Sequence, residues 1–528
     1  MHASLAKACV PATFNSLGLF GGDIISLETT LVSNYSAYVP GLFRYTAPTV
    51  ELANATFCNV TVSYTHPSQN DNIYVEAWLP TNNWNERFQA VGGGGWVAGR
   101  FYPSYVAMQG ALADGYATIT TDAGLGSAMD ANSWAQVSPG NVNLYNLQNL
   151  ASVSLNDEAI IGKQLIKGYY GKAPLYSYWN GCSQGGRQGM VLAQRYPDAY
   201  DGIAAGAPAF YWTEFVPSTT WPQQVLSMLG HYPYNCETDA LTAAAITVCD
   251  KLDQVRDGII SEPEECLARF DPFRFVGMRI NCTQTNSTVR ITKAAAILVN
   301  ETWHGPRAVD GTKLWYGLNP GADITGDAPT SYEPGVAATN CTGTTCVGIS
   351  NTLNQWTKLF VSKNPILDVT NLTHEEWDNL FHSSSQQYRS FVGSADPDLR
   401  AFSKTGGKML SFHGVQDNII PLRGSHQYYN AVASISPDIH NFYRLFEVPG
   451  LGHCFGGRSQ QPSGLFEQLR LWVESGEAPE TSPINVTDIT GSQVLGSRVL
   501  CPYPQKQRLI ERCTDTAAAK CWGCTRRQ

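Results

Sequence analysis

The sequence predicts an α/β fold with a mainly parallel sheet that is interrupted by one long insertion. Two observations carry this prediction. Predicted strands alternate with predicted helices from residue 73 to residue 206, and the alternation returns after residue 408. From about residue 210 to about residue 400 the chain is instead rich in Trp, Tyr, Asn, Thr, Gly and Pro.

The chain length agrees with this division. At 528 residues the chain exceeds the size at which one hydrophobic core usually stops growing. We therefore expect residues 1–209 and 401–528 to form a catalytic domain, and residues 210–400 to form an inserted lid domain.

Hydrophobic patterning predicts the elements of the core in order. Short apolar or alternating runs indicate strands, and apolar residues at helical spacing indicate helices. The predicted strands are residues 73–80, 87–91, 117–122, 174–179, 201–206, 408–414 and 441–448, and the predicted helices are residues 154–168, 187–195 and 424–433.

A nucleophile pattern lies between the strand at 174–179 and the helix at 187–195. In Gly181-x-Ser183-x-Gly185, small residues stand on both sides of a serine. A strained strand-to-helix turn requires this, because a Cβ at the glycine positions would clash. Ser183 is therefore the predicted nucleophile, and a glycine-rich turn with an ordinary serine is the alternative.

An activated serine needs a base, and the base needs an acid that orients it. Asp417 follows the strand at 408–414, and His453 lies in a glycine-rich loop after the strand at 441–448. The chain order serine, aspartate, histidine is typical of α/β-hydrolases, so we expect an α/β-hydrolase core with a large inserted lid. His413 is expected to support the turn that presents Asp417.

Composition excludes some partners and favours one compartment. The net charge is −9 and no lysine- or arginine-rich run is present, so nucleic acid is not an expected partner. No apolar stretch approaches the roughly 20 residues that span a bilayer. Fourteen cysteines and many Asn-x-Ser/Thr sequons favour a secreted, extracellular protein. The first residues lack a signal-peptide pattern, so we expect a mature form with an added start.

Two cysteines flank the predicted catalytic residues. Cys182 precedes Ser183 and Cys454 follows His453, so a disulfide between the two cysteines would tie the elbow to the histidine loop. Bonded cysteines have Cα atoms roughly 4.4–6.8 Å apart, which would restrict the distance between their neighbours. Each cysteine could also pair elsewhere, because 14 cysteines allow many connectivities.

These segments together resemble the tannase/feruloyl esterase family, over nearly the whole chain. The resemblance implies that Ser183 attacks an ester carbonyl, that His453 takes and returns the proton, and that Asp417 holds the imidazole. Secreted fungal feruloyl esterases are the most similar members, and bacterial terephthalate monoester hydrolases are more distant. The matching segments are residues 92–95, 179–186, 200–208, 413–417 and 452–454.

Two backbone N–H groups are expected to form an oxyanion hole. One belongs to Gln184, the residue after the nucleophile, and the other to Gly94 or Gly95 in the run of four glycines. A tight structural turn is the alternative role of this run.

A short acidic loop lies in the insertion between Cys249 and Cys266, whose bonding would close it. Its carboxylates suit calcium, although the spacing is not that of an EF-hand and a solvated loop is an equal alternative from the residues alone. The family resemblance implies a structural Ca²⁺ in the lid, remote from the nucleophile. Its implied ligands are the side chains of Asp250, Asp253 and Asp257 and the carbonyls of Val255 and Ile259.

A phenolic ring needs apolar walls, and the insertion is rich in aromatic side chains. Lid core is the alternative role for each of them. The residues expected to bind substrate are Tyr211, Trp212, Tyr388, Phe391 and Ile420.

The expected function is that of a secreted serine esterase that cleaves feruloyl or caffeoyl esters of plant cell wall material. Its partners would be small aromatic esters, free or attached to polysaccharide, and the protein would be a monomer or homodimer. A tannase acting on galloyl esters and a hydrolase of other small aromatic esters share the triad and are the alternatives. A catalytically dead binding protein is disfavoured by the intact triad.

Overall fold

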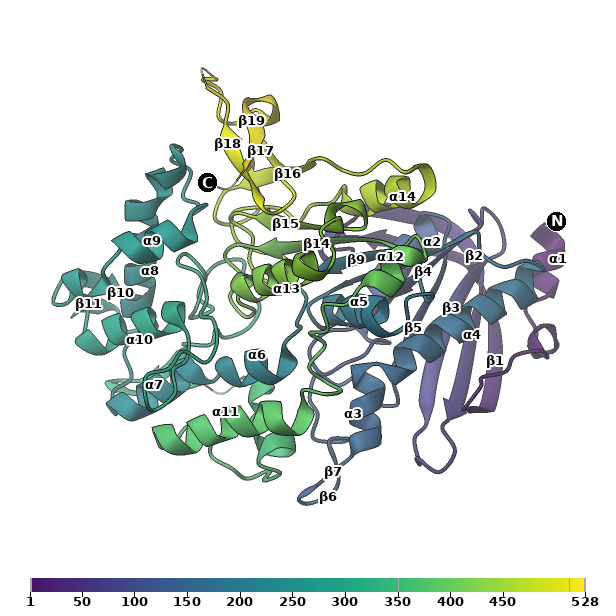
Figure 1. The fold of residues 1–528 in the computed structure, drawn as a ribbon, viewed down its shortest axis with the longest axis horizontal. Coiled ribbons are helices and arrows are strands. Elements are labelled where there is room, and N and C mark those ends of the chain that lie inside the picture. The colour runs from purple at the N-terminus through teal and green to yellow at the C-terminus, as the bar shows by residue number, and fades with distance from the viewer. Residues whose placement is uncertain (1, 350, 512, 527–528) are drawn as a thin grey trace.

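A nine-stranded sheet forms the centre of the computed structural model, which describes residues 2–349, 351–511 and 513–526 (Figure 1). The strand order is β1-β2-β3-β5-β4-β8-β9-β14-β15. The strands are β1 (Asp23–Val39), β2 (Val50–Thr65), β3 (Ile73–Pro80), β4 (Arg87–Val91), β5 (Ala117–Thr121), β8 (Tyr176–Cys182), β9 (Gly202–Gly206), β14 (Lys408–Gly414) and β15 (Tyr443–Val448).

Six neighbouring strands, from β5 to β15 in the sheet order, run parallel. The predicted mainly parallel sheet of an α/β-hydrolase core is therefore confirmed. The long strands β1 and β2 were not predicted; β1 pairs antiparallel with β2, and β2 pairs antiparallel with β3. β1 lies at the sheet edge, where its side chains are exposed or half-buried for most of its length, so it lacks a continuous apolar signal.

The parallel strands are buried on both faces because helices cover both sides. Tyr178 and Trp179 are successive residues of β8 and pack into different hydrophobic clusters, as the two-residue period of a strand requires. Helices α4 (Val153–Tyr170), α5 (Gln184–Arg195) and α13 (Leu422–Ile435) cover the face of Trp179 (Figure 1). The other face is covered by α2 (Tyr102–Ala113) and α14 (Leu465–Ser475).

The insertion lies between β9 and β14, since all nine strands of the central sheet fall within residues 23–206 and 408–448. It is mainly helical and lies beside the carboxyl ends of the parallel strands (Figure 1). The boundaries at 210 and 400 remain a prediction. Its main helices are α6 (Trp212–Ser218), α7 (Trp221–Leu229), α8 (Asn235–Cys249), α9 (Pro263–Arg269), α10 (Lys293–His304) and α11 (His374–Tyr388), and its hairpins are β10 (Arg279–Cys282) with β11 (Ser287–Arg290) and β12 (Thr339–Thr342) with β13 (Thr345–Gly348).

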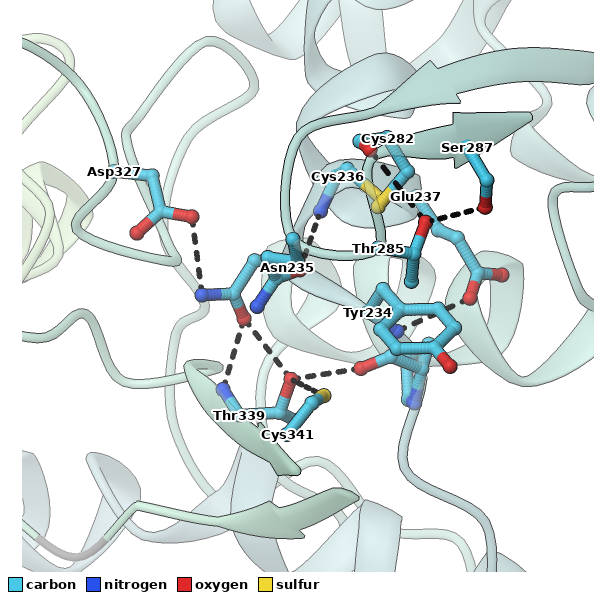
Figure 2. The surroundings of a disulfide bond; sticks show 12 residues. Tyr234, Asn235, Cys236, Glu237, Cys282, Thr285, Ser287, Asp327, Thr339 and Cys341 are labelled. Atoms are coloured by element: carbon cyan, nitrogen blue, oxygen red, sulfur yellow. Dashed lines mark hydrogen bonds between the residues drawn. A yellow bond between two sulfur atoms is a disulfide. The ribbon is translucent and has the colours of Figure 1, made fainter. Parts of the chain in front are cut away.

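A disulfide and a polar network hold the insertion together (Figure 2). Cys236, at the start of α8, bonds to Cys282 at the end of β10. The neighbouring Asn235 side chain accepts hydrogen bonds from Thr339 and donates one to Asp327 over 3.1 Å. These contacts tie the start of α8 to the hairpin strands β10 and β12 and to the loop of Asp327.

Two further hairpins end the chain, β16 (Ser482–Thr487) with β17 (Val494–Leu500) and β18 (Gln505–Leu509) with β19 (Trp522–Arg526). They reach the acidic loop of the insertion. Arg498 of β17 contacts Asp257, and Trp522 packs in one cluster with Val255. Among the described residues, no helix is long and apolar enough to cross a membrane.

Candidate active site

Ser183 occupies a sharp turn between β8 and α5. Its φ of 62° and ψ of −122° lie in a region that non-glycine residues rarely adopt. The flanking glycines make the turn possible, because a Cβ on Gly181 would lie 2.7 Å from the backbone of Gly185. A Cβ on Gly185 would in turn lie 2.9 Å from the carbonyl oxygen of Gly93. The strand, turn and helix thus present the serine side chain beyond the carboxyl end of the sheet.

The structure brings the three predicted triad residues together. Ser183 Oγ lies 2.8 Å from Nε2 of His453, and Nδ1 of His453 lies 2.8 Å from Oδ2 of Asp417. The three residues follow β8, β15 and β14, which lie close together in the sheet order. This is the geometry of a nucleophile, a base and an acid that orients the base.

Asp417 is held as a carboxylate by its surroundings. Burial would raise its pKa, but the neighbouring imidazoles of His453 and His413 outweigh burial, so the pKa lies well below the usual value. Its Oδ1 also accepts the backbone N–H groups of Ile419 and Ile420. The fully buried His413 lies 3.2 Å from Oδ2 of Asp417, in the supporting place that the sequence predicts.

The charge state of His453 depends on two opposing effects. Burial lowers its pKa, whereas the carboxylate of Asp417 and its hydrogen bond raise the pKa, and Glu333 adds to the rise. The net pKa lies above the ordinary value for histidine. The imidazolium that would form after proton transfer from Ser183 is therefore stabilised.

The elbow and the histidine loop are joined covalently. Cys182 is paired with Cys454, with Cα atoms 6.0 Å apart and a sequence separation of 272. The predicted pairing is present. Cys454 also has a positive φ, 60°, so both loops at the site contain a strained non-glycine residue beside the bond.

The glycine run and Gln184 offer backbone donors to the site. The N–H of Gly94 donates to the carbonyl of Val97 over 3.0 Å and is therefore engaged. The N–H groups of Gln184 and Gly95 have no acceptor among the described residues, and both residues line the cavity that contains Ser183. Of the two predicted glycines, Gly95 is thus the one with a free donor.

The cavity at Ser183 has a volume of about 220 Å³ and lies between the core and the insertion. Its apolar walls come from both sides. The apolar wall residues that precede the nucleophile, Phe43, Phe101 and Met129, were not predicted, and the only sequence signal for Phe101 is its position shortly after the glycine run. The main apolar wall residues are Phe43, Phe101, Met129, Trp212, Phe215 and Leu353.

Comparison with known proteins identifies the family of the chain that carries this site. The sequence model described as "Tannase and feruloyl esterase" matches residues 58–521. The chain belongs to the tannase and feruloyl esterase family. Membership makes it a carboxylic ester hydrolase.

Relatives within the family agree with this assignment. The chain is 41% identical over 454 residues to the "Probable feruloyl esterase" of Arthroderma benhamiae, a match that covers 85% of this chain and 82% of that protein. It is 27% identical to the "Tannase" of Aspergillus oryzae, covering 95% and 90%. Among solved structures, the tannin acyl hydrolase from Aspergillus niger superposes with a TM-score of 0.84 at 26% identity, covering 99% of this chain and 95% of that one.

In this family member, only one of the five predicted substrate residues, Trp212, lines the catalytic cavity. Tyr388 instead packs in the lid core against Trp356 and Phe391, and its hydroxyl donates to a backbone carbonyl. The ring of Tyr211 lies tilted against that of Trp315, with centroids 5.1 Å apart, and lines a different cavity.

Ile420, which was also predicted to bind substrate, does not line the catalytic cavity. Its side chain is buried, and its backbone N–H serves Asp417, whereas the preceding Ile419 lines the cavity. Patterning in the sequence cannot separate cavity wall from lid core, because both are apolar and buried.

The acidic loop satisfies part of what a calcium site requires. The Cys249–Cys266 disulfide closes it, and Oδ2 of Asp253 is buried with no hydrogen-bond partner among the described residues. Asp250 accepts three backbone N–H groups, from residues 257–259. Within the described ranges, no three Asp, Glu, His or Cys side chains converge as a metal site of side chains alone would need. A cation would therefore depend on backbone carbonyls as well.

The acidic loop is not remote from the whole of the site. Ile259 lies against Gly450, the residue at which the histidine loop begins. The loop thus contacts the segment that carries His453, whereas its remoteness from Ser183 stays a prediction.

Proposed function

We propose that the protein cleaves esters of hydroxycinnamic acids, such as feruloyl and caffeoyl esters, through an acyl-enzyme on Ser183. The observation that supports this most is the hydrogen-bonded chain of Ser183, His453 and Asp417, which opens into an aromatic-walled cavity. Similarity to a relative named as a feruloyl esterase favours the same substrate class.

The geometry supports a two-step reaction. Ser183 Oγ attacks the ester carbonyl while Nε2 of His453 takes the hydroxyl proton. The N–H groups of Gln184 and Gly95 donate to the oxyanion of the tetrahedral intermediate. The C–O bond to the alcohol then breaks, and His453 gives its proton to the leaving oxygen. Water then attacks the acyl-enzyme while His453 takes its proton. His453 returns the proton to Ser183 Oγ as the carboxylic acid is released.

Two further parts of the proposal concern stability and location. All 14 cysteines are paired, which suits an oxidising, extracellular compartment, where disulfides persist. We also propose that the acidic loop holds Ca²⁺ through Asp250, Asp253, Asp257 and the carbonyls of Val255 and Ile259. The ion would order the loop and supply no reacting group.

A panel of methyl esters tests the substrate class. Methyl ferulate or methyl caffeate should be hydrolysed with a higher kcat/KM than methyl gallate. A galloyl ring buries three hydroxyls, and a hydroxyl without a partner in an apolar cavity costs about 1–3 kcal/mol, so a difference of about tenfold or more is expected.

A tannase is the second function to consider, because the A. niger tannin acyl hydrolase superposes over 99% of this chain. A clear preference for methyl gallate in the same panel would assign that function. It would leave the roles of Ser183, His453 and Asp417 unchanged.

A further inference from the structure

A second cavity, of about 520 Å³, shares no wall residue with the catalytic cavity among the described residues. The start of α6 borders both cavities. Tyr211 and Glu214 line the second cavity. Trp212 and Phe215, each one residue further along, line the catalytic cavity. Residues three positions apart share one side of a helical turn, and successive residues differ by about 100°. The two cavities therefore lie against different sides of the same turn.

The second cavity forms where the insertion meets the core. One wall is the loop after α10 that contains Lys313 and Trp315, and another is residues 389–395 after α11. Gln427 of α13 closes the cavity on the core side. The loop packs directly on α13, since a Cβ on Gly424 would lie 3.3 Å from the ring of Trp315. α6 lies beside α11 and α13 (Figure 1), so core and insertion build this cavity together.

Three aromatic rings form one wall of the second cavity. The ring centroid of Trp315 lies 5.1 Å from that of Tyr211 and 5.1 Å from that of Tyr316. Tyr211 and Tyr316 are half-buried, so part of each ring is open. Tyr211 also has a positive φ, 53°, and its side chain is hydrogen-bonded to Gln427. Open ring faces of this kind suit the apolar C–H face of a sugar ring.

The same wall gathers positive charge. Nζ of Lys313 lies 4.9 Å from the ring centroid of Tyr316, and Cζ of Arg423 lies 5.6 Å from that centroid. Lys313 makes no salt bridge with a carboxylate of the described residues. Burial lowers the pKa of Lys313, and the charges of Arg423 and Arg307 lower that pKa further. Like charges without a counter-ion, in a chain of net charge −9, favour an anionic ligand.

Arg389 adds a free donor on the opposite wall. Its Nε donates to Oε1 of Glu214 over 2.9 Å, and its Nη2 contacts the same carboxylate. Nη1 of Arg389 has no acceptor among the described residues, and the side chain is 66% exposed. Because Arg389 already balances Glu214, the charge of Lys313 remains uncompensated. Ammonium and guanidinium groups bind carboxylates through charge-assisted hydrogen bonds.

We propose that the second cavity is a non-catalytic binding site for a uronate unit of an acidic polysaccharide. The sugar ring packs on Tyr211 and Tyr316, its carboxylate accepts from Lys313 and Arg389, and its hydroxyls bond to Gln427. A neutral sugar would leave Lys313 without a counter-ion, and a free aromatic acid would leave Gln427 without hydroxyl partners. The site goes beyond the proposed function, because it holds a polymer beside the catalytic cavity and does not touch the reacting ester.

Binding of two matched trisaccharides to the wild-type protein tests the proposal. The probes are trigalacturonate and its carboxyl-reduced trimer, which differ only in the carboxylates, and calorimetric titration measures both Kd values. We expect the Kd of trigalacturonate to be about tenfold lower, as one charge-assisted hydrogen bond provides. Added salt should weaken the binding of trigalacturonate and leave that of the neutral trimer unchanged.

Two variants and a matched control locate the binding. Lys313→Gln should raise the Kd of trigalacturonate about tenfold and leave the neutral trimer unaffected, whereas Tyr316→Ala should weaken both. Lys293 is an exposed lysine of the same insertion, at the start of α10, and does not line this cavity. Lys293→Gln should therefore change neither Kd. All three variants should keep the wild-type kcat/KM for methyl ferulate, and their melting temperatures show whether each one is folded.

The outcomes separate this proposal from the proposed function. If methyl ferulate is not hydrolysed, the proposed function fails, but binding of trigalacturonate that depends on Lys313 still supports the site. Equal Kd values for the two trimers, or a Kd of trigalacturonate unchanged by Lys313→Gln, would overturn the site. If titration of ferulate depends on Lys313 and that of trigalacturonate does not, the cavity binds an aromatic acid and the sugar assignment is overturned. A loss of methyl ferulate hydrolysis in folded Lys313→Gln would overturn the non-catalytic role.

Discussion

The carboxyl end of the sheet and the insertion contribute to the site in different ways. At the carboxyl end, Ser183, Asp417 and His453 follow β8, β14 and β15, so the register of parallel strands sets their positions. In the insertion, Trp212 and Phe215 reach the cavity from α6, whereas Tyr388 of α11 turns into the lid core. Reactive groups are thus held by backbone pairing, while the substrate walls depend on how side chains pack.

Among the changes considered, removal of the nucleophile at the carboxyl end of the sheet should have the largest effect on activity. Ser183→Ala should lower kcat by on the order of 10⁴-fold or more, because loss of one triad member removes most of the covalent route. Its melting temperature should stay close to that of the wild type. Near-normal turnover by this variant would show that the nucleophile lies elsewhere.

A pair of disulfides compares the two regions directly. Replacing Cys182 and Cys454 by Ser should lower kcat/KM by roughly 10- to 100-fold, since small displacements of reacting groups are costly. Removing Cys341 and Cys346, whose bond closes a short hairpin in the insertion, should leave kcat/KM nearly unchanged.

The same pairs differ in expected stability. In the chain-entropy estimate, a bond that spans 272 residues contributes about 6 kcal/mol to the free energy of unfolding, and one that spans 5 residues about 2 kcal/mol. Peptide mapping without reduction checks the pairing. Equal losses of kcat/KM in both double variants would contradict a special role for the bond beside Ser183.

The calcium proposal concerns the stability of the acidic loop of the insertion. Chelation should lower the melting temperature, since a ligand present at 100-fold excess over its Kd stabilises the native state by about 2.7 kcal/mol. Asp253→Asn should abolish the response to chelator, whereas Asp310→Asn, at an exposed carboxylate of the same insertion, should keep it. Protein that contains no calcium on metal analysis and melts unchanged with chelator would mean that the aspartates are merely solvated.

The smallest expected effect concerns the pH dependence of kcat/KM. His453 acts as a base only when neutral, and its pKa is raised, so kcat/KM should increase with pH and reach half its maximum above the ordinary histidine value of about 6.5. Glu333 of the insertion contributes to this rise. Glu333→Gln should therefore move the profile to lower pH, by about a few tenths of a unit for an exposed charge. An unmoved profile would show that the insertion does not tune the base.

The sequence by itself determined the chemistry of this protein. Gly181 and Gly185 around Ser183 specify the elbow, because a local steric requirement needs no knowledge of distant segments. Asp417 and His453 could be placed because each follows a strand of a parallel sheet, and such strands present their carboxyl ends at one edge. The proximity of Cys182 and Cys454 follows from the same arrangement.

The tertiary structure alone decided the shape of the space around that chemistry. Whether Gly94 or Gly95 keeps a free N–H depends on a single hydrogen bond to Val97. The cavity walls bring Phe43 of the N-terminal region against Leu353 of the insertion, residues that no local pattern relates. Burial of an apolar side chain lowers the free energy whichever apolar residues surround it, so the sequence does not specify its neighbours. Only the packed chain shows which apolar side chains face the substrate.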